Sequence, residues 1–161
     1  MRCILLALPL LALVSTAHAQ VPPAIAAPGE TIVATWHAEG AQVYECKAGP
    51  DGKLAWAFRE PIATLLSDSK TVGRHYAGPN WEHMDGSAVV GKVAANAPGA
   101  TPKDIPLLKL DVVSSRGSGA LSGVTTVQRV HTVGGRHEGA CDKAGAFHSA
   151  PYAADYVFLK K

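Results

Sequence analysis

Short hydrophobic runs recur along most of the chain, separated by turn-forming residues at intervals of about 8–15 positions. In the clearest run, Leu54, Trp56 and Phe58 alternate with other residues, so the three large side chains would share one face of a β-strand. We expect strands in seven segments: 42–47, 54–59, 81–84, 87–93, 107–113, 124–133 and 152–159. This spacing is typical of an all-β domain.

Turn signals connect several of these segments. Residues 49–52 read Gly-Pro-Asp-Gly, and Asp85 with Gly86 forms a dipeptide favoured at tight hairpin turns. Residues 107–113 are apolar on nearly both faces, which is typical of a central strand. Residues 61–67 fit either a strand or a helical turn with proline at its first position. Because no pattern indicates crossover helices, we predict a single-domain antiparallel β-sandwich or β-barrel with at most short helical turns.

The first nineteen residues have the pattern of a signal peptide. Arg2 supplies the positive start, residues 4–14 form an apolar run, and residues 17–19 read Ala-His-Ala, the small-x-small pattern of a cleavage site. The apolar run is shorter than the roughly 20 residues that a membrane-spanning helix needs. We therefore expect a periplasmic or secreted protein with no membrane span once residues 1–19 are removed.

The expected mature chain has two parts, a Pro- and Ala-rich extended arm over residues 20–29 and one β domain over residues 30–161. Hydrophobic residues make up 47% of the sequence and charged residues 17%, which argues against a disordered protein. After cleavage, 14 Lys and Arg stand against 13 Asp and Glu, a formal net charge of +1. Such a balance offers no basic surface for phosphate backbones, so we expect no nucleic-acid partner.

Cysteine usage agrees with export. Cys3 would leave with the leader, so that Cys46 and Cys141 remain as an even pair. Two thiols in an oxidising compartment usually form a disulfide. The disulfide would close a loop of about 95 residues, which on chain-entropy grounds would stabilise the fold by about 4.5 kcal/mol.

Residues 73–87 form the segment richest in reactive side chains. A four-residue turn at 77–80 would give three cross-strand pairs: Tyr76 with Trp81, His75 with Glu82, and Arg74 with His83. A packed structural corner is one interpretation, since Gly78 allows a positive φ and the following proline fixes the next residue.

A second interpretation is catalysis. A carboxylate beside an imidazole raises its pKa and can orient it as a general base. The candidate catalytic residues are His75, Glu82, His83 and Asp85. The same groups suit Zn or Cu, with His131, His137 or His148 completing a metal shell, although no cofactor is assigned. The alternative function is therefore a hydrolytic or metal-dependent enzyme centred on this segment.

A third interpretation is ligand binding. If Tyr76 and Trp81 are exposed, their flat faces suit stacking on sugars or other ligands, with Arg74 beside them. Gln128 and Arg129 interrupt an apolar strand, which indicates either a solvated face or the wall of a polar cavity. These five residues are the candidate ligand-binding residues.

The chain lacks the G-x-S-x-G, H-E-x-x-H, Walker and G-x-G-x-x-G motifs, which argues against a zincin, a P-loop enzyme or a nicotinamide dehydrogenase. We therefore favour a non-catalytic binding or structural module, with a cell-envelope polymer or a small ligand as its partner. Its oligomeric state is left open.

The chain also resembles a known family. The similarity lies in residues 75–82 (His-Tyr-Ala-Gly-Pro-x-Trp-Glu), 85–89 (Asp-Gly-Ser-x-Val), 42–46 with Trp56, 124–135, Cys141 and 151–158. Together these residues resemble a secreted family of bacteria and fungi catalogued as domain of unknown function 3455. Leu107 departs from the family pattern, which commonly has Trp after the proline. The resemblance implies a secreted single domain with a paired cysteine, and it implies no activity.

Overall fold

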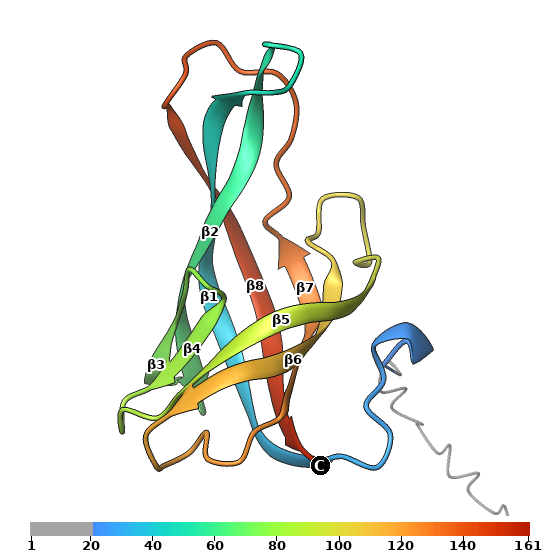
Figure 1. Ribbon diagram of the computed structural model, residues 1–161, viewed down its shortest axis with the longest axis vertical. Coiled ribbons are helices and arrows are strands. Elements are labelled where there is room, and N and C mark those ends of the chain that lie inside the picture. Colours follow the sequence, from blue (N-terminus) through green and yellow to red (C-terminus); the bar gives the residue numbers. More distant parts are fainter. Residues whose placement is uncertain (1–20) are drawn as a thin grey trace, which may run out of the picture.

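Eight antiparallel strands close into a barrel in the computed structural model, which describes residues 21–161 (Figure 1). The strands are β1 (Thr31–Ala48), β2 (Leu54–Ser67), β3 (Lys70–Tyr76), β4 (Asn80–His83), β5 (Ala88–Ala97), β6 (Leu107–Arg116), β7 (Thr126–Gly134) and β8 (Phe147–Lys160). Each strand pairs with its neighbours in sequence, and β1 pairs with β8 to complete the ring. The predicted all-β antiparallel domain is confirmed, and of the two predicted architectures it is the barrel.

Two details of the predicted elements differ. Residues 61–67 continue β2 rather than forming a helical turn, because they pair with both β1 and β3. In β6 Leu110 lies in the core while Val113 is 59% exposed, so this strand is not buried on both faces. Within residues 21–161, no helix has the length and apolar character needed to cross a membrane. The predicted signal peptide, residues 1–19, lies outside the described residues.

A hydrophobic core lies inside the barrel. Trp36 and Phe158 pack with ring centroids 4.7 Å apart, and Leu65 and Val89 are fully buried beside them in the same cluster. The loop between β6 and β7 adds Leu121, which is 1% exposed. This loop closes the lower end of the barrel.

The upper part of the barrel is less completely closed. The hairpin of β3 and β4 is short, so it pairs with β2 only over residues 63–67 and with β5 only over residues 88–90. Above the hairpin, β2 and β5 diverge (Figure 1). The hairpin therefore joins the lower halves of β2 and β5, and the pairing through it does not extend to their upper halves.

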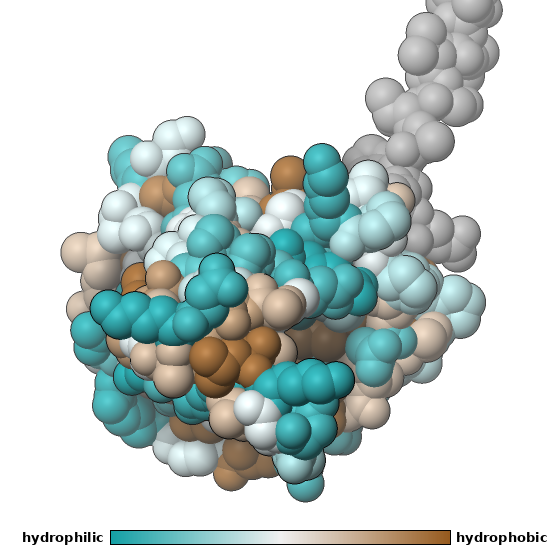
Figure 2. Space-filling model, turned by 90° about the horizontal axis from the view of Figure 1, so that it is seen from above, coloured by the Kyte–Doolittle hydropathy of each residue, from teal (hydrophilic) through white to brown (hydrophobic). Residues whose placement is uncertain are grey.

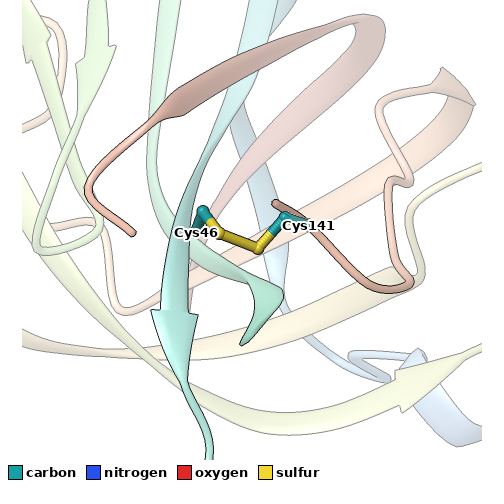
Figure 3. Close-up of a disulfide and its surroundings, with 2 residues drawn as sticks. All are labelled: Cys46 and Cys141. Atoms are coloured by element: carbon teal, nitrogen blue, oxygen red, sulfur yellow. A yellow bond between two sulfur atoms is a disulfide. The ribbon is translucent and has the colours of Figure 1, made fainter. Parts of the chain in front are cut away.

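The predicted disulfide between Cys46 and Cys141 is present (Figure 3). It joins β1 to the segment that follows β7, with the two Cα atoms 5.9 Å apart. The same segment pairs with β2, because the amide of Trp56 donates to the carbonyl of Gly139 at 3.0 Å. The bridge thus holds the segment over the upper end of the barrel.

The N-terminal arm is not simply extended, as predicted, but includes the 3-10 turn η1 (Pro23–Ile25). Ile25 is completely buried and packs in a cluster with Ala97 and Val130 on the outside of the barrel. Gln128 Nε2 donates to the Ile25 carbonyl at 2.6 Å. Apolar burial and this hydrogen bond together hold the arm against the barrel wall.

Candidate functional site

The register of the β3–β4 hairpin differs from the predicted one by one residue. His75 pairs with Trp81 and Arg74 with Glu82, because the connection is a three-residue turn over residues 77–79 rather than a four-residue turn. Gly78 adopts a φ of 136°, a conformation that side chains disfavour and glycine permits. A shift of one residue exchanges the partners across the strands, so the predicted pair of His75 with Glu82 does not form.

The outer face of the hairpin carries an ionic cluster centred on Glu82. Its Oε2 accepts the hydroxyl of Tyr76 at 2.8 Å and lies 3.1 Å from Arg74 Nη2 and 2.9 Å from Arg116 Nη2. The Tyr76 hydrogen bond, with Arg74, holds the pKa of the Glu82 carboxyl below its ordinary value. Tyr76 and Arg74 are thus engaged with each other and with Glu82 on the barrel exterior.

The inner face carries His75 and Trp81. Their rings stack with centroids 4.5 Å apart, and Tyr156 of β8 lies 4.9 Å from His75 and 5.3 Å from Trp81. His75 is 3% exposed and Trp81 is 1% exposed, so the predicted exposure of Trp81 is wrong. The alternation of strand residues turns both side chains into the barrel, where apolar burial stabilises them.

His75 is a neutral imidazole at neutral pH. Burial lowers its pKa to about 3; the hydrogen bond to the Asn80 carbonyl opposes this shift, and the nearby charge of Arg129 adds to it. Nδ1 lies 2.7 Å from the Asn80 carbonyl, which can only accept, so Nδ1 carries the proton and Nε2 is left as an acceptor. An imidazole with so low a pKa is a poor general base near neutral pH.

The remaining two candidate catalytic residues hold turns together. Asp85 accepts the amide of Ser87 at 2.8 Å, the hydroxyl of Ser87 at 2.6 Å and the amide of Ala120 at 2.8 Å. These bonds, the Ser87 hydroxyl foremost, keep the pKa of Asp85 far below its ordinary value. His83 lies 2.9 Å from Asp85 and stacks on Trp36. Asp85 therefore links the β4–β5 turn to the loop that closes the lower barrel.

The predicted metal shell is not assembled in residues 21–161, where no three His, Cys, Asp or Glu side chains are arranged to hold an ion. His131 instead lies 2.8 Å from Asp155 on the exterior. His137 and His148 stack on each other with centroids 3.8 Å apart, beside Trp56. Of the three histidines proposed to complete the shell, His137 and His148 thus lie together, and His131 lies apart from them.

A cavity of about 540 Å³ lies inside the upper barrel. All eight strands contribute to its wall, whose apolar part consists of Tyr44, Phe58, Pro61, Pro79, Trp81, Val93, Ile105, Pro106, Leu108, Leu110 and Tyr156. Trp81 and Tyr156 also belong to the hydrophobic core, so they form the boundary between the filled and the hollow halves of the barrel.

The cavity opens between β2 and β5. Phe58 of β2 is 55% exposed and Val93 of β5 is 50% exposed, although both line the cavity. Exposed large hydrophobic side chains on both sides of an opening are typical of a mouth. Figure 2, which looks onto the molecule from above, shows a hollow with hydrophobic surface in and beside it and hydrophilic groups around it.

Polar atoms without partners lie in the cavity wall. Trp81 Nε1 and Gln42 Nε2 are buried and have no hydrogen-bond partner within residues 21–161. Buried donors are nearly always hydrogen-bonded in proteins, and leaving one unpaired costs free energy.

Of the two polar residues predicted in β7, one faces the cavity and one does not. Arg129 lines the cavity, and its Nε and Nη2 donate to the Pro106 carbonyl at 3.0 and 2.9 Å. Gln128 lies on the outer face of the barrel, where the arm buries it, so neither of the two predicted alternatives, a solvated face or a cavity wall, describes it. Trp81 and Arg129 are thus the candidate binding residues that the structure brings to one site.

Sequence reasoning missed several wall residues, among them Gln42, Tyr44, Phe58, Leu108 and Tyr156. The alternation of residues within each strand predicts which side chains share a face. It does not predict which of these faces surround a cavity. The arrangement of faces around a cavity depends on pairing between strands that lie far apart in sequence.

The chain belongs to the family described as "Protein of unknown function (DUF3455)", whose model matches residues 26–160. This match confirms the family resemblance found in the sequence. Comparison with curated proteins gave no match, and comparison with solved structures gave none either.

Proposed function

We propose that this chain is an exported, non-catalytic binding module that holds a small, mainly apolar molecule in the barrel cavity. The observation that carries the proposal is the cavity itself. Its volume of about 540 Å³ falls within the range of roughly 300–1,000 Å³ typical of small-molecule sites. Its wall is aromatic and aliphatic with a few polar atoms, which is the usual composition of such sites.

The candidate catalytic side chains support binding over catalysis. His75 faces the interior, whereas Glu82 contacts Tyr76 on the exterior. Asp85 is committed to backbone and hydroxyl donors of neighbouring turns. A hydrolytic mechanism would need these groups to converge on one reacting atom.

A neutral apolar dye, N-phenyl-1-naphthylamine, tests the proposal directly, because its fluorescence rises in apolar surroundings. We expect the purified protein to bind the dye and Leu108→Trp, which fills the cavity, to weaken binding at least about tenfold. Val113→Trp is the matched control, since it adds the same side chain to the same strand at an exposed position outside the cavity. Equal dye binding by the two variants would contradict a site in the barrel.

Export rests on the leader pattern and on the disulfide, which persists in oxidising compartments. Mass spectrometry of the protein recovered from its native cells tests it. We expect a chain that begins at Gln20 and whose mass rises by two hydrogens on reduction. A chain that retains Met1 and has two free thiols would contradict export.

A further inference from the structure

We propose that the molecule held in the cavity is an apolar carboxylate, whose anionic group is bound by Arg129. This inference rests on the proposed function and adds the chemical class of the ligand. It follows from the charges around the cavity rather than from the size of the cavity.

Arg129 is the only arginine of residues 21–161 without an ion pair. The others, Arg59, Arg74, Arg116 and Arg136, each lie within 3.3 Å of a carboxylate oxygen. Arg129 donates to the Pro106 carbonyl through Nε and Nη2, and its guanidinium also interacts with the Tyr156 hydroxyl. The guanidinium has five N–H groups, so donors remain for a further partner.

The cavity supplies no negative charge to balance this cation. Within the described chain, its lining includes two arginines and one histidine but neither Asp nor Glu. The second arginine, Arg59, lies at the mouth and is already paired with Glu45 and Glu60 at 3.3 and 2.9 Å. The uncompensated charge of the site is therefore the charge of Arg129.

The charge of Arg129 acts inside the cavity and not only at its edge. It contributes to the lowered pKa of His75 and opposes the burial-driven rise in the pKa of Tyr156, two groups on the cavity wall. A partly buried cation without a counter-charge is costly, and a carboxylate can accept two parallel N–H bonds from a guanidinium.

The rest of the cavity wall indicates the chemistry of the rest of the ligand. Tyr44, Phe58, Trp81 and Tyr156 offer aromatic surface for the apolar part of the ligand. Together with Arg129, these features suit an apolar body with an oxygen-rich acceptor group at one end. They do not suit a cation, because Arg129 would repel it and no carboxylate would bind it.

Two probes of nearly equal shape test the charge, naphthalene-2-carboxylate and the neutral 2-naphthalenemethanol, titrated into the intact protein by calorimetry at pH 7. We expect the carboxylate to bind at least about tenfold more tightly, the usual effect of one charge-assisted hydrogen bond. Arg129→Met should remove this preference while leaving the alcohol bound as tightly or more tightly. Arg116→Met is the matched control, because Arg116 is paired with Glu82 and does not line the cavity, and it should keep the preference.

The outcomes separate the two proposals. An alcohol that binds the wild-type protein as tightly as the carboxylate would overturn the carboxylate inference and leave the cavity as an apolar binding site. Binding of neither probe, together with no binding of the neutral dye, would overturn the proposed function as well. Because the comparison of the two probes uses the wild-type protein, it decides the inference even if Arg129→Met does not fold.

Discussion

The two faces of the β3–β4 hairpin differ sharply in chemistry although they come from the same few residues. On the outer face, Arg74, Tyr76 and Glu82 form a hydrogen-bonded ionic cluster in contact with water. On the inner face, His75 and Trp81 stack in nearly complete burial. The reactive side chains of this hairpin therefore do not form one site, because successive residues of a strand point to opposite faces of the sheet.

The two faces also differ in their relation to the proposed binding site. The outer cluster satisfies its own charges, which is what a solvated sheet surface needs. The inner face forms the floor of a cavity and leaves the indole nitrogen of Trp81 without a partner. Unsatisfied groups, rather than the mere presence of histidines and carboxylates, indicate where a ligand would bind.

The largest expected effect on stability comes from removing the Trp81 side chain from the inner face of the hairpin. Trp81→Ala should lower the free energy of unfolding by about 3–5 kcal/mol, because it removes a buried aromatic side chain and enlarges the cavity. Urea denaturation of the wild-type and variant proteins measures the difference. Arg74→Ala on the outer face is the control, and a loss no larger than that of this control would contradict the central packing role of Trp81.

A smaller effect should appear as a dependence on pH. The unfolded chain protonates His75 below about pH 6.5, whereas the folded protein resists protonation until about pH 3. The unfolded state therefore binds more protons in this range, and stability must fall as the pH falls from 6.5 toward 3. Relative to His75→Asn, the wild-type protein should lose roughly 2–4 kcal/mol more between pH 7 and pH 4.

Asparagine is chosen because its amide can still donate to the Asn80 carbonyl in place of Nδ1. Denaturation curves at several pH values provide the measurement. Parallel pH profiles for the two proteins would show that His75 titrates normally in the folded state.

The smallest effect is expected on the outer face. Glu82→Gln should lower the Tm by less than about 3 °C, since exposed ion pairs contribute little and salt screens them. The depressed pKa of Glu82 means that its contribution is present above the ordinary carboxyl pKa and is lost as the pH falls below it. Differential scanning calorimetry at pH 7 and pH 5.5 should give the same small difference, and 1 M NaCl should abolish it. A large salt-independent loss would contradict a solvated cluster.

Features that depend on residues close together in the sequence, or on a simple count, could be predicted from the sequence. The alternation of Leu54, Trp56 and Phe58 predicted a strand, and that strand is part of β2. The count of cysteines after leader removal predicted the bridge of Cys46 with Cys141. Both inferences use local pattern or simple elimination.

The register of the hairpin and the cavity could not be obtained in this way. The difference between a three-residue and a four-residue turn at Gly78 changes every cross-strand pair, and both turns satisfy the local sequence. The burial of Trp81 depends on β8, which supplies Tyr156 from 75 positions later in the chain. Arg129 was singled out because it interrupts an apolar strand, yet its missing counter-charge is visible only when all neighbours are placed.

The bridge between Cys46 and Cys141 has a consequence for resistance to proteolysis. It encloses β2 to β7 in a covalent ring, so a protease that cuts one peptide bond within that ring severs the backbone without releasing a fragment. The nicked molecule would keep its full mass until reductant is added, and its two pieces would stay close enough to restore the barrel.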